Sequence, residues 1–98
     1  MDIKNLAMFN HLAQSLHFGK TAQAMYITPS TLSRAIQRLE QTVGTRLFER
    51  NNRAVTLTPS GRLFLQFSAQ TLANWQTLQS ELALQEQQLS GELSVYCS

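Results

Sequence analysis

Residues 28–40 read Thr28-Pro29-Ser30-Thr31-Leu32-Ser33-Arg34-Ala35-Ile36-Gln37-Arg38-Leu39-Glu40. Their spacing predicts a helix with two chemically different faces. One face is an apolar stripe with the i, i+4, i+7, i+11 spacing of a core-facing helix, formed by Leu32, Ile36, Leu39 and Val43. The opposite face carries hydroxyls, amides and arginine, namely Ser30, Ser33, Arg34, Gln37 and Gln41. Side chains of these types contact base edges and phosphates, although the same face also suits an ordinary solvated helix.

The residues around this helix predict a helix-turn-helix. Thr28 suits the N-cap, Pro29 the first helical position and Gly44 the helix end. Residues 20–25 predict a short preceding helix, and only residues 26–28 separate the two, so the helices must cross steeply. Upstream, an amphipathic helix capped by Asp2 is predicted from the three- and four-residue spacing of Leu6, Phe9, Leu12, Ala13 and Leu16. The sequence therefore predicts a three-helix unit.

After the third helix, the sequence predicts a β-hairpin. Residues 47–48 and 55–57 are strand-prone, and Asn51-Asn52 between them is typical of a turn. Arg50 and Arg53 lie at the shoulders of this loop, where they can reach phosphates or a minor groove. The alternative is that one of them pairs with Glu49 or with a helix end. Leu47 and Phe48 are expected in the core.

Thr58-Pro59-Ser60-Gly61 predicts the start of a long helix, because no proline or glycine follows until Gly91. Such a helix has about 30 residues and a length of roughly 45 Å. Its first turns carry apolar residues that are expected to dock on the three-helix unit: Leu63, Phe64 and Phe67. Further along it carries an apolar stripe of Leu72, Trp75, Leu78, Leu82 and Leu89. A long isolated helix with one apolar face is marginal in water, so it should pair with a second copy or, alternatively, pack on another domain of its own chain.

The last residues predict a boundary. Ser90-Gly91 should end the helix, and residues 93–98 alternate in the pattern of a strand. Since a strand needs a partner and none follows, residues 91–98 are expected to be the first strand of a further domain.

Charge is unevenly distributed along the chain. All eight Lys and Arg lie at or before Arg62 with three of the six acids, so that part carries +5 and the remainder −3. One end of the molecule is therefore suited to a polyanion. The sequence predicts no enzyme: the single Cys97 allows no disulfide or thiolate cluster, and His11 and His17 do not share a helix face. No catalytic residue, metal site, cofactor, signal peptide or membrane span is predicted, and a cytoplasmic location is expected.

A family signature runs through residues 1–61. It consists of Phe18-Gly19-Lys20-Thr21-Ala22-Gln23-Ala24-Met25, then Ser33, Ile36, Leu39-Glu40, Gly44, Leu47-Phe48, Arg50, Leu57-Thr58 and Gly61. At these spacings the chain resembles the amino-terminal domain of LysR-type transcriptional regulators. Pro29, Thr21 and Ser60 depart from the glutamine, alanine and alanine that are common in the family.

The resemblance implies a mainly α fold: a winged helix-turn-helix of three helices and a β-hairpin wing, followed by a long dimerisation linker helix. Residues 1–58 would be the DNA-binding domain, with the helix-turn-helix at about 18–37, residues 59–90 the linker, and residues 91–98 the start of an effector-binding domain. The side chains expected at DNA are Thr28, Pro29, Ser30, Thr31, Ser33, Arg34, Gln37, Arg38, Arg50, Asn51 and Arg53. Those expected at a dimer interface are Leu72, Trp75, Leu78, Leu82 and Leu89.

The implied partners are double-stranded DNA with a pseudo-palindromic operator, a second copy of the chain, and a small-molecule effector that binds only through a carboxy-terminal domain; no membrane is implied. The tail and the wing are most similar to the subfamily that activates acetohydroxy acid isomeroreductase in branched-chain amino-acid synthesis. The alternative function is a helical dimerisation or adaptor module that binds protein rather than DNA.

Overall fold

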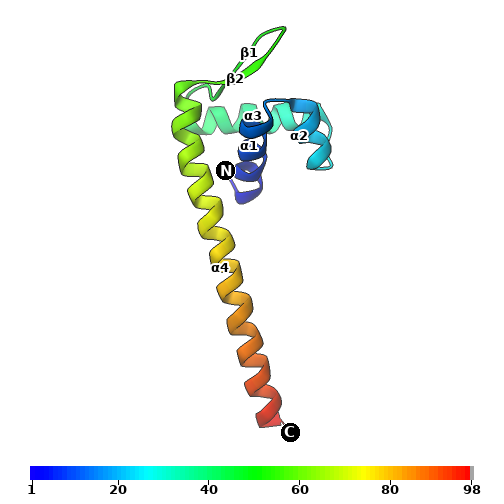
Figure 1. The fold of residues 1–98 in the computed structure, drawn as a ribbon, viewed down its shortest axis with the longest axis vertical. Coiled ribbons are helices and arrows are strands. Elements are labelled where there is room, and N and C mark those ends of the chain that lie inside the picture. Colours follow the sequence, from blue (N-terminus) through cyan, green and yellow to red (C-terminus); the bar gives the residue numbers. More distant parts are fainter. Residues whose placement is uncertain (98) are drawn as a thin grey trace.

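The computed structural model describes the backbone of residues 1–97 and the side chains of residues 1–87. Three helices form a head, a two-stranded hairpin projects from it, and a long helix runs away from it (Figure 1). The elements are α1 (Ile3–Ser15), α2 (Phe18–Ala24), α3 (Pro29–Val43), β1 (Phe48–Arg50), β2 (Val55–Leu57) and α4 (Pro59–Cys97). The mainly α, winged helix-turn-helix architecture is confirmed.

The core lies where α1 meets the other elements. Phe9 is fully buried, and its ring centroid lies 5.3 Å from that of Phe48 and 4.9 Å from that of Phe64, the latter edge-on. One aromatic residue of α1 thus contacts both the wing and the long helix, in geometries that aromatic pairs prefer. The predicted α3 stripe is buried at Leu32, Ile36 and Leu39. The prediction that Val43 lies in the core is wrong, since this residue ends α3 and is 37% exposed.

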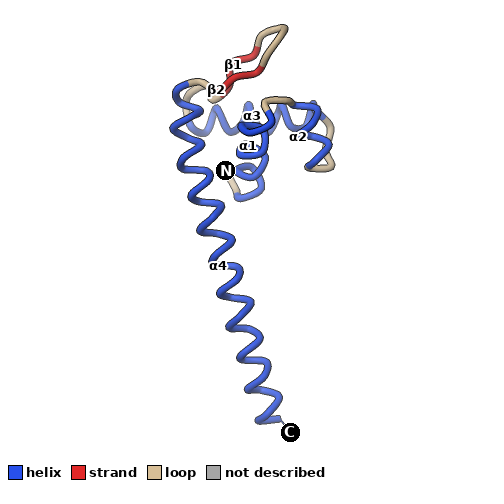
Figure 2. The backbone as a smooth tube through the Cα atoms, viewed as in Figure 1, coloured by secondary structure: helices blue, strands red, loops and turns tan. Residues whose placement is uncertain are grey.

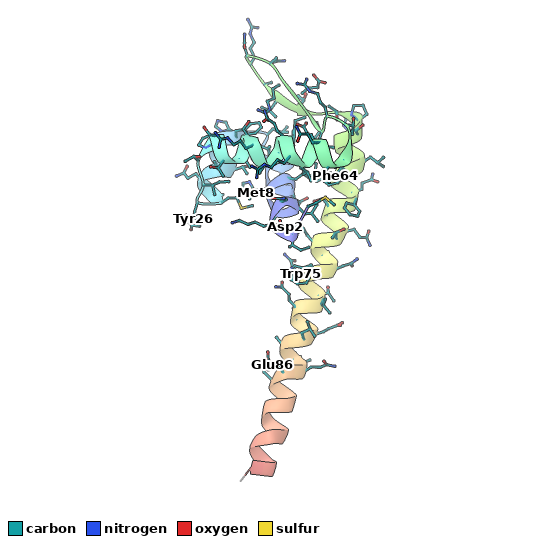
Figure 3. All side chains as sticks on the ribbon, turned by 180° about the vertical axis from the view of Figure 1, so that it is seen from behind. Asp2, Met8, Tyr26, Phe64, Trp75 and Glu86 are labelled. Carbon is teal, nitrogen blue, oxygen red and sulfur yellow. The ribbon has the colours of Figure 1, made fainter. Side chains whose placement is uncertain are left out.

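The helix-turn-helix is held by local capping. α2 begins at Phe18 rather than near Lys20, because the His17 ring nitrogen Nδ1 accepts the Lys20 N–H at 3.0 Å. The C-cap of α1 is Leu16, which adopts a left-handed conformation with φ 53° and is exposed rather than in the core. Tyr26 in the α2–α3 turn has φ 58° and projects from the far end of the head (Figure 3). Both left-handed residues reverse the chain, a task that more often falls to glycine or asparagine.

The hairpin is antiparallel and short, with Phe48 opposite Leu57 and Arg50 opposite Val55 (Figure 2). Leu47 and Phe48 are buried, as predicted. The base of the hairpin is fixed to α3, since Glu40 Oε2 accepts the backbone N–H of Leu47 at 2.8 Å and of Phe48 at 3.3 Å. The wing therefore has a defined direction relative to α3.

Thr58 joins the wing to α4. Its hydroxyl caps the helix by accepting the Gly61 N–H at 2.9 Å, and it donates to the carbonyl of Arg46 at 2.7 Å. Gly61 packs against the same segment: a Cβ at this position would lie 2.1 Å from the Leu47 carbonyl oxygen. Only glycine permits this approach, and the contact fixes how α4 is rotated about its own axis.

Two sequence predictions about α4 are wrong, the first of them because of this rotation. Phe64 and Leu65 pack on the core and the Ser68 hydroxyl donates to the Leu6 carbonyl at 3.2 Å, whereas Leu63 is 70% exposed and Phe67 50% exposed. The expected docking of Leu63 and Phe67 on the head is therefore wrong. In addition, α4 continues through Gly91 to Cys97, where a helix end and a strand were predicted. A strand would leave its backbone groups without a neighbour in this chain, and a helix satisfies them locally.

Candidate functional site

The exposed face of α3 lines an open groove at the surface of the head. Ser30, Arg34 and Gln37 are exposed and Ser33 is half-buried. The groove, about 520 Å³ in volume, is lined by Phe18, Pro29, Ser30, Ser33, Arg34, Gln37 and Arg50. The structure thus brings together residues of α2, α3 and β1 in one continuous surface, which includes six of the eleven residues predicted at DNA.

The Arg50 side chain extends from β1 across the groove to α2 and α3. Its guanidinium nitrogen Nη1 donates to the Ser33 hydroxyl at 3.0 Å, and its guanidinium carbon lies 4.2 Å from the centroid of the Phe18 ring. The predicted alternatives, pairing with Glu49 or with a helix end, are replaced by this cation–π contact and hydrogen bond. Arg50 therefore connects the wing, the start of α2 and the exposed face of α3, and it keeps further donors for a ligand.

The two threonines at the start of α3 serve the helix itself. Thr28 Oγ1 accepts the Thr31 N–H at 3.2 Å, and the two hydroxyls are 2.9 Å apart. Pro29 occupies the first turn, as its fixed φ favours. Both threonines remain exposed, so their other hydrogen-bonding positions face solvent beside the groove.

The tip of the wing is shaped by Asn51. Its side-chain oxygen accepts the N–H groups of Arg53 at 2.9 Å and Ala54 at 2.8 Å. The left-handed non-glycine residues of the described chain are Leu16 and Tyr26, so this Asx-type turn forms without a left-handed residue at Asn51 or Asn52. Arg53 is exposed and lines a second groove, shared with residues 16–19 and the wing.

Arg38 lies on the other flank of α3. It lines a third groove together with Met1 and Asn5 at the start of α1. Its position, one turn after Arg34 on an exposed face, suits a contact at the border of a ligand that covers the main groove.

Two features of the site were not found from the sequence. The first is Arg46, which lines two grooves that continue the α3 groove beyond Gln37, one with Phe48 and Arg50 and one with Gln41 and Thr45. Helical periodicity could not assign Arg46 to this surface, because Arg46 follows Gly44 and therefore lies beyond the end of α3.

The second is a polar contact between α1 and α2. The buried Thr21 hydroxyl lies 2.7 Å from His11 Nδ1 and 2.7 Å from the Ser15 hydroxyl. The two partners satisfy a hydroxyl that would otherwise be costly to bury. His11, expected at the surface, is half-buried for this reason, whereas His17 does lie at a helix end. The feature of the sequence that could have indicated this contact is Thr21, a polar residue at a position where alanine is common in the resembled family.

The stripe on α4 is largely exposed below the head. Figure 3 labels Trp75 on the part of α4 below the head. Trp75 is 38% exposed, Leu78 44% and Leu82 51%, whereas Leu72 is half-buried. Leu84, 60% exposed, lies outside the predicted stripe. Leu89 lies outside the residues whose side chains the structure describes.

Within residues 1–97, the structure has no helix long and apolar enough to cross a membrane. Among the described residues, no three His, Cys, Asp or Glu side chains are grouped as metal ligands would be.

Comparisons with known proteins agree with this geometry. Residues 3–62 match the family model described as bacterial regulatory helix-turn-helix protein, lysR family. The transcriptional activator IlvY of Salmonella typhimurium is 52% identical and the regulator IlvY of Escherichia coli 51% identical, each over all 98 residues. The chain spans about a third of the length of these curated relatives, 33% in both cases.

Solved structures of similar proteins include DNA complexes. The chain superposes on BenM_DBD in complex with benA site 1 DNA with a TM-score of 0.80 at 34% identity, covering 85% of this chain and 93% of that one. It superposes on Vibrio fischeri DarR in complex with DNA with a TM-score of 0.84 at 31% identity, covering 89% of this chain and 30% of that one.

Proposed function

The chain belongs to the LysR family of bacterial regulatory helix-turn-helix proteins, and from that premise we propose that it binds duplex DNA as the amino-terminal part of a transcriptional regulator. The observation that carries the proposal is the groove that α3 and Arg50 form at the surface of the head. Hydroxyl, amide and guanidinium groups converge there from α3 and β1, and this is the chemistry that reads base edges.

In this proposal, the amino-terminal half of α3 enters the major groove. Arg34 and Gln37 are exposed, project from the same side of α3 and can make bidentate contacts, to guanine and adenine respectively. Ser30, Ser33 and Pro29 approach the bases or sugars, Thr28 and Thr31 the phosphates beside the helix start, and Arg38 the phosphates at the flank. A backbone contact orients the complex, and a base contact specifies its sequence.

The wing contributes a second contact in the adjacent minor groove. Arg53 is exposed near the tip, and the Asn51 turn holds the loop in a compact form. A narrow minor groove concentrates negative potential and attracts arginine. Arg50, held at the base of the wing by Ser33 and Phe18, would join the phosphate contacts there.

We propose that the chain acts as a dimer through α4. The exposed stripe at Trp75, Leu78 and Leu82 is apolar surface for which the head offers no cover. A second copy, with its own Leu72 and Leu89, would bury it. Such a two-fold dimer presents two α3 helices and therefore reads a pseudo-palindromic operator with half-sites separated by whole helical turns.

The likeness to IlvY activators supports a role in activating genes of branched-chain amino-acid synthesis. In the longer regulator, a carboxy-terminal domain beyond α4 would bind the effector, by analogy an acetohydroxy acid. The 98-residue chain should bind its operator with equal affinity with and without that ligand, because a ligand that makes no differential contact cannot shift an equilibrium.

Footprinting of the chain on genomic DNA, followed by titration of the recovered duplex and a scrambled duplex at several salt concentrations, tests the proposal. Binding of the recovered duplex should be tighter than that of the scrambled one, and both should weaken steeply with salt as counterions are released. Absence of DNA binding at low salt would leave the protein-binding adaptor as the better explanation.

A further inference from the structure

We infer that Arg46, which no sequence motif singled out, is a phosphate-contacting residue at the carboxyl-terminal border of the DNA interface. The inference rests on the proposed DNA-binding function and deepens it. The inference assigns a DNA contact to the segment between α3 and β1, in addition to the contacts proposed for α3 and for the wing.

The grooves along α3 form a continuous path that leads to Arg46. The groove at the start of α3 ends at Gln37 and Arg50. A second groove, of about 130 Å³, begins at these same two residues and extends to Arg46. A third, of about 520 Å³, shares Gln37 and Arg46 and ends at Thr45 and Gly44. A ligand that lies along the first groove therefore meets the Arg46 side chain at its border.

Distance favours a phosphate over a base as the partner of Arg46. Ser30 and Gln37 are seven residues apart, which is about 10 Å along a helix. This length is close to the width of the major groove, about 12 Å. Arg46 follows the helix end, a further nine residues along the chain, so that it lies at the edge of the groove, where the backbone of the DNA runs.

The chain holds Arg46 in place through its backbone and leaves the side chain exposed. The Arg46 carbonyl accepts the Thr58 hydroxyl at 2.7 Å, and the next residue, Leu47, donates its N–H to Glu40 at 2.8 Å. The nearby Glu40 carboxylate is directed at two backbone N–H groups through Oε2. Arg46 is exposed, and replacement of its side chain removes none of these backbone contacts.

The test is the salt dependence of DNA binding by Arg46→Ala, with Arg62→Ala as the matched control. Arg62 is also exposed but lies on the first turn of α4. Loss of one phosphate contact should lower the slope of log affinity against log salt by about 0.9, a change of roughly 3.5-fold in affinity between 50 and 200 mM salt. Operator and scrambled duplexes should be affected alike, and Arg46→Lys should restore the slope because it keeps the charge.

A slope for Arg46→Ala equal to that of the unmutated chain, or a loss confined to the operator, overturns the inference. Helical circular dichroism and thermal melting check that both variants are folded. If Arg46→Ala is unstable, Arg46→Gln and Arg46→Lys, which keep the length of the side chain, are compared instead. Failure of the unmutated chain to bind any duplex would refute the proposed function itself, which separates the two results.

Discussion

Glu40 Oε2 accepts the backbone N–H of Leu47 at a distance of 2.8 Å, and this bond ties the last turns of α3 to the base of the wing. A second N–H, from Phe48, points at the same oxygen at 3.3 Å. Both donors lie in a buried segment, since Leu47 is 0% exposed and Phe48 2% exposed. Leu47 precedes β1 and Phe48 is its first residue, so the carboxylate accepts both N–H groups where the strand begins.

Glu40→Ala should therefore destabilise the head. Leaving two buried N–H groups without a charged acceptor should lower the free energy of unfolding by about 2–3 kcal/mol. Glu40→Gln should lose less, because the amide oxygen can still accept. Urea denaturation followed by circular dichroism measures both. Equal stability of the alanine variant and the unmutated chain would show that water replaces the carboxylate.

Gly61→Ala should also be destabilising, for a steric reason. Its Cβ would lie 2.1 Å from the Leu47 carbonyl oxygen, so either α4 or the base of the wing must move. Forced movement of packed backbone typically costs about 1–3 kcal/mol and occasionally more. Ser60→Ala, at the neighbouring half-buried position, is the control and should change thermal stability little. A Gly61→Ala melt that coincides with that of Ser60→Ala would contradict the close approach.

Arg34 and Arg38 should differ in what they contribute to DNA binding. Arg34 lines the groove of the α3 face, so Arg34→Ala should cost on the order of 1–3 kcal/mol on the operator and much less on scrambled DNA. Arg38 lines the flank, and its removal should weaken both duplexes by the same factor. Fluorescence anisotropy with the two duplexes distinguishes these outcomes. Equal losses for Arg34→Ala on both would reassign that residue to phosphate.

The wing prediction concerns the flanks of the half-site. Arg53→Ala should weaken binding most where an A·T-rich, narrow minor groove lies beside the site, because such a groove has the strongest negative potential. Asn52→Ala, in the same exposed loop, is the matched control. If Arg53→Ala binds A·T-rich and G·C-rich flanks with unchanged affinity, the hairpin only braces α3.

Leu82→Glu should convert the chain from dimer to monomer in analytical ultracentrifugation at micromolar concentration. A charge in the middle of the apolar stripe cannot be buried without a partner. Thr77→Glu is the control, because the exposed Thr77 lies about 100° or more around the helix from every residue of the stripe, so that this variant adds the same charge away from it. A monomeric unmutated chain at that concentration would remove the basis for the α4 dimer.

Local signals predicted most of the fold. Thr28-Pro29 and Thr58-Pro59 begin helices in the structure as their chemistry predicts, and the stripe at Leu32, Ile36 and Leu39 is buried. These features depend on residues within a few turns of each other, which a sequence displays directly. The DNA-contact and dimer residues remain predictions.

The sequence predictions were wrong where a contact between distant parts of the chain determines the position of a side chain. The apolar pattern of α4 does not reveal its docking face, because that face begins with Gly61 and includes Ser68, which are small or polar and fit closely against the head. Leu63 and Phe67 were therefore assigned to the wrong side. Likewise, the partners of Arg50 lie 17 and 32 residues away in sequence, at Ser33 and Phe18, where no spacing rule reaches.

The contacts of Thr58 and Gly61 with residues 46–47 fix α4 rigidly to the head, so that α4 is a rigid arm with the head at one end. The 39 residues of α4 are, at about 1.5 Å each, roughly 58 Å long. A tilt of about 6° around the far end of such a helix therefore displaces α3 by roughly 6 Å, nearly two base-pair steps of about 3.4 Å. In the proposed dimer, a rigid connection would transmit this displacement to α3 in full, so a small change of angle at the carboxyl end of α4 would change the spacing between the two α3 helices.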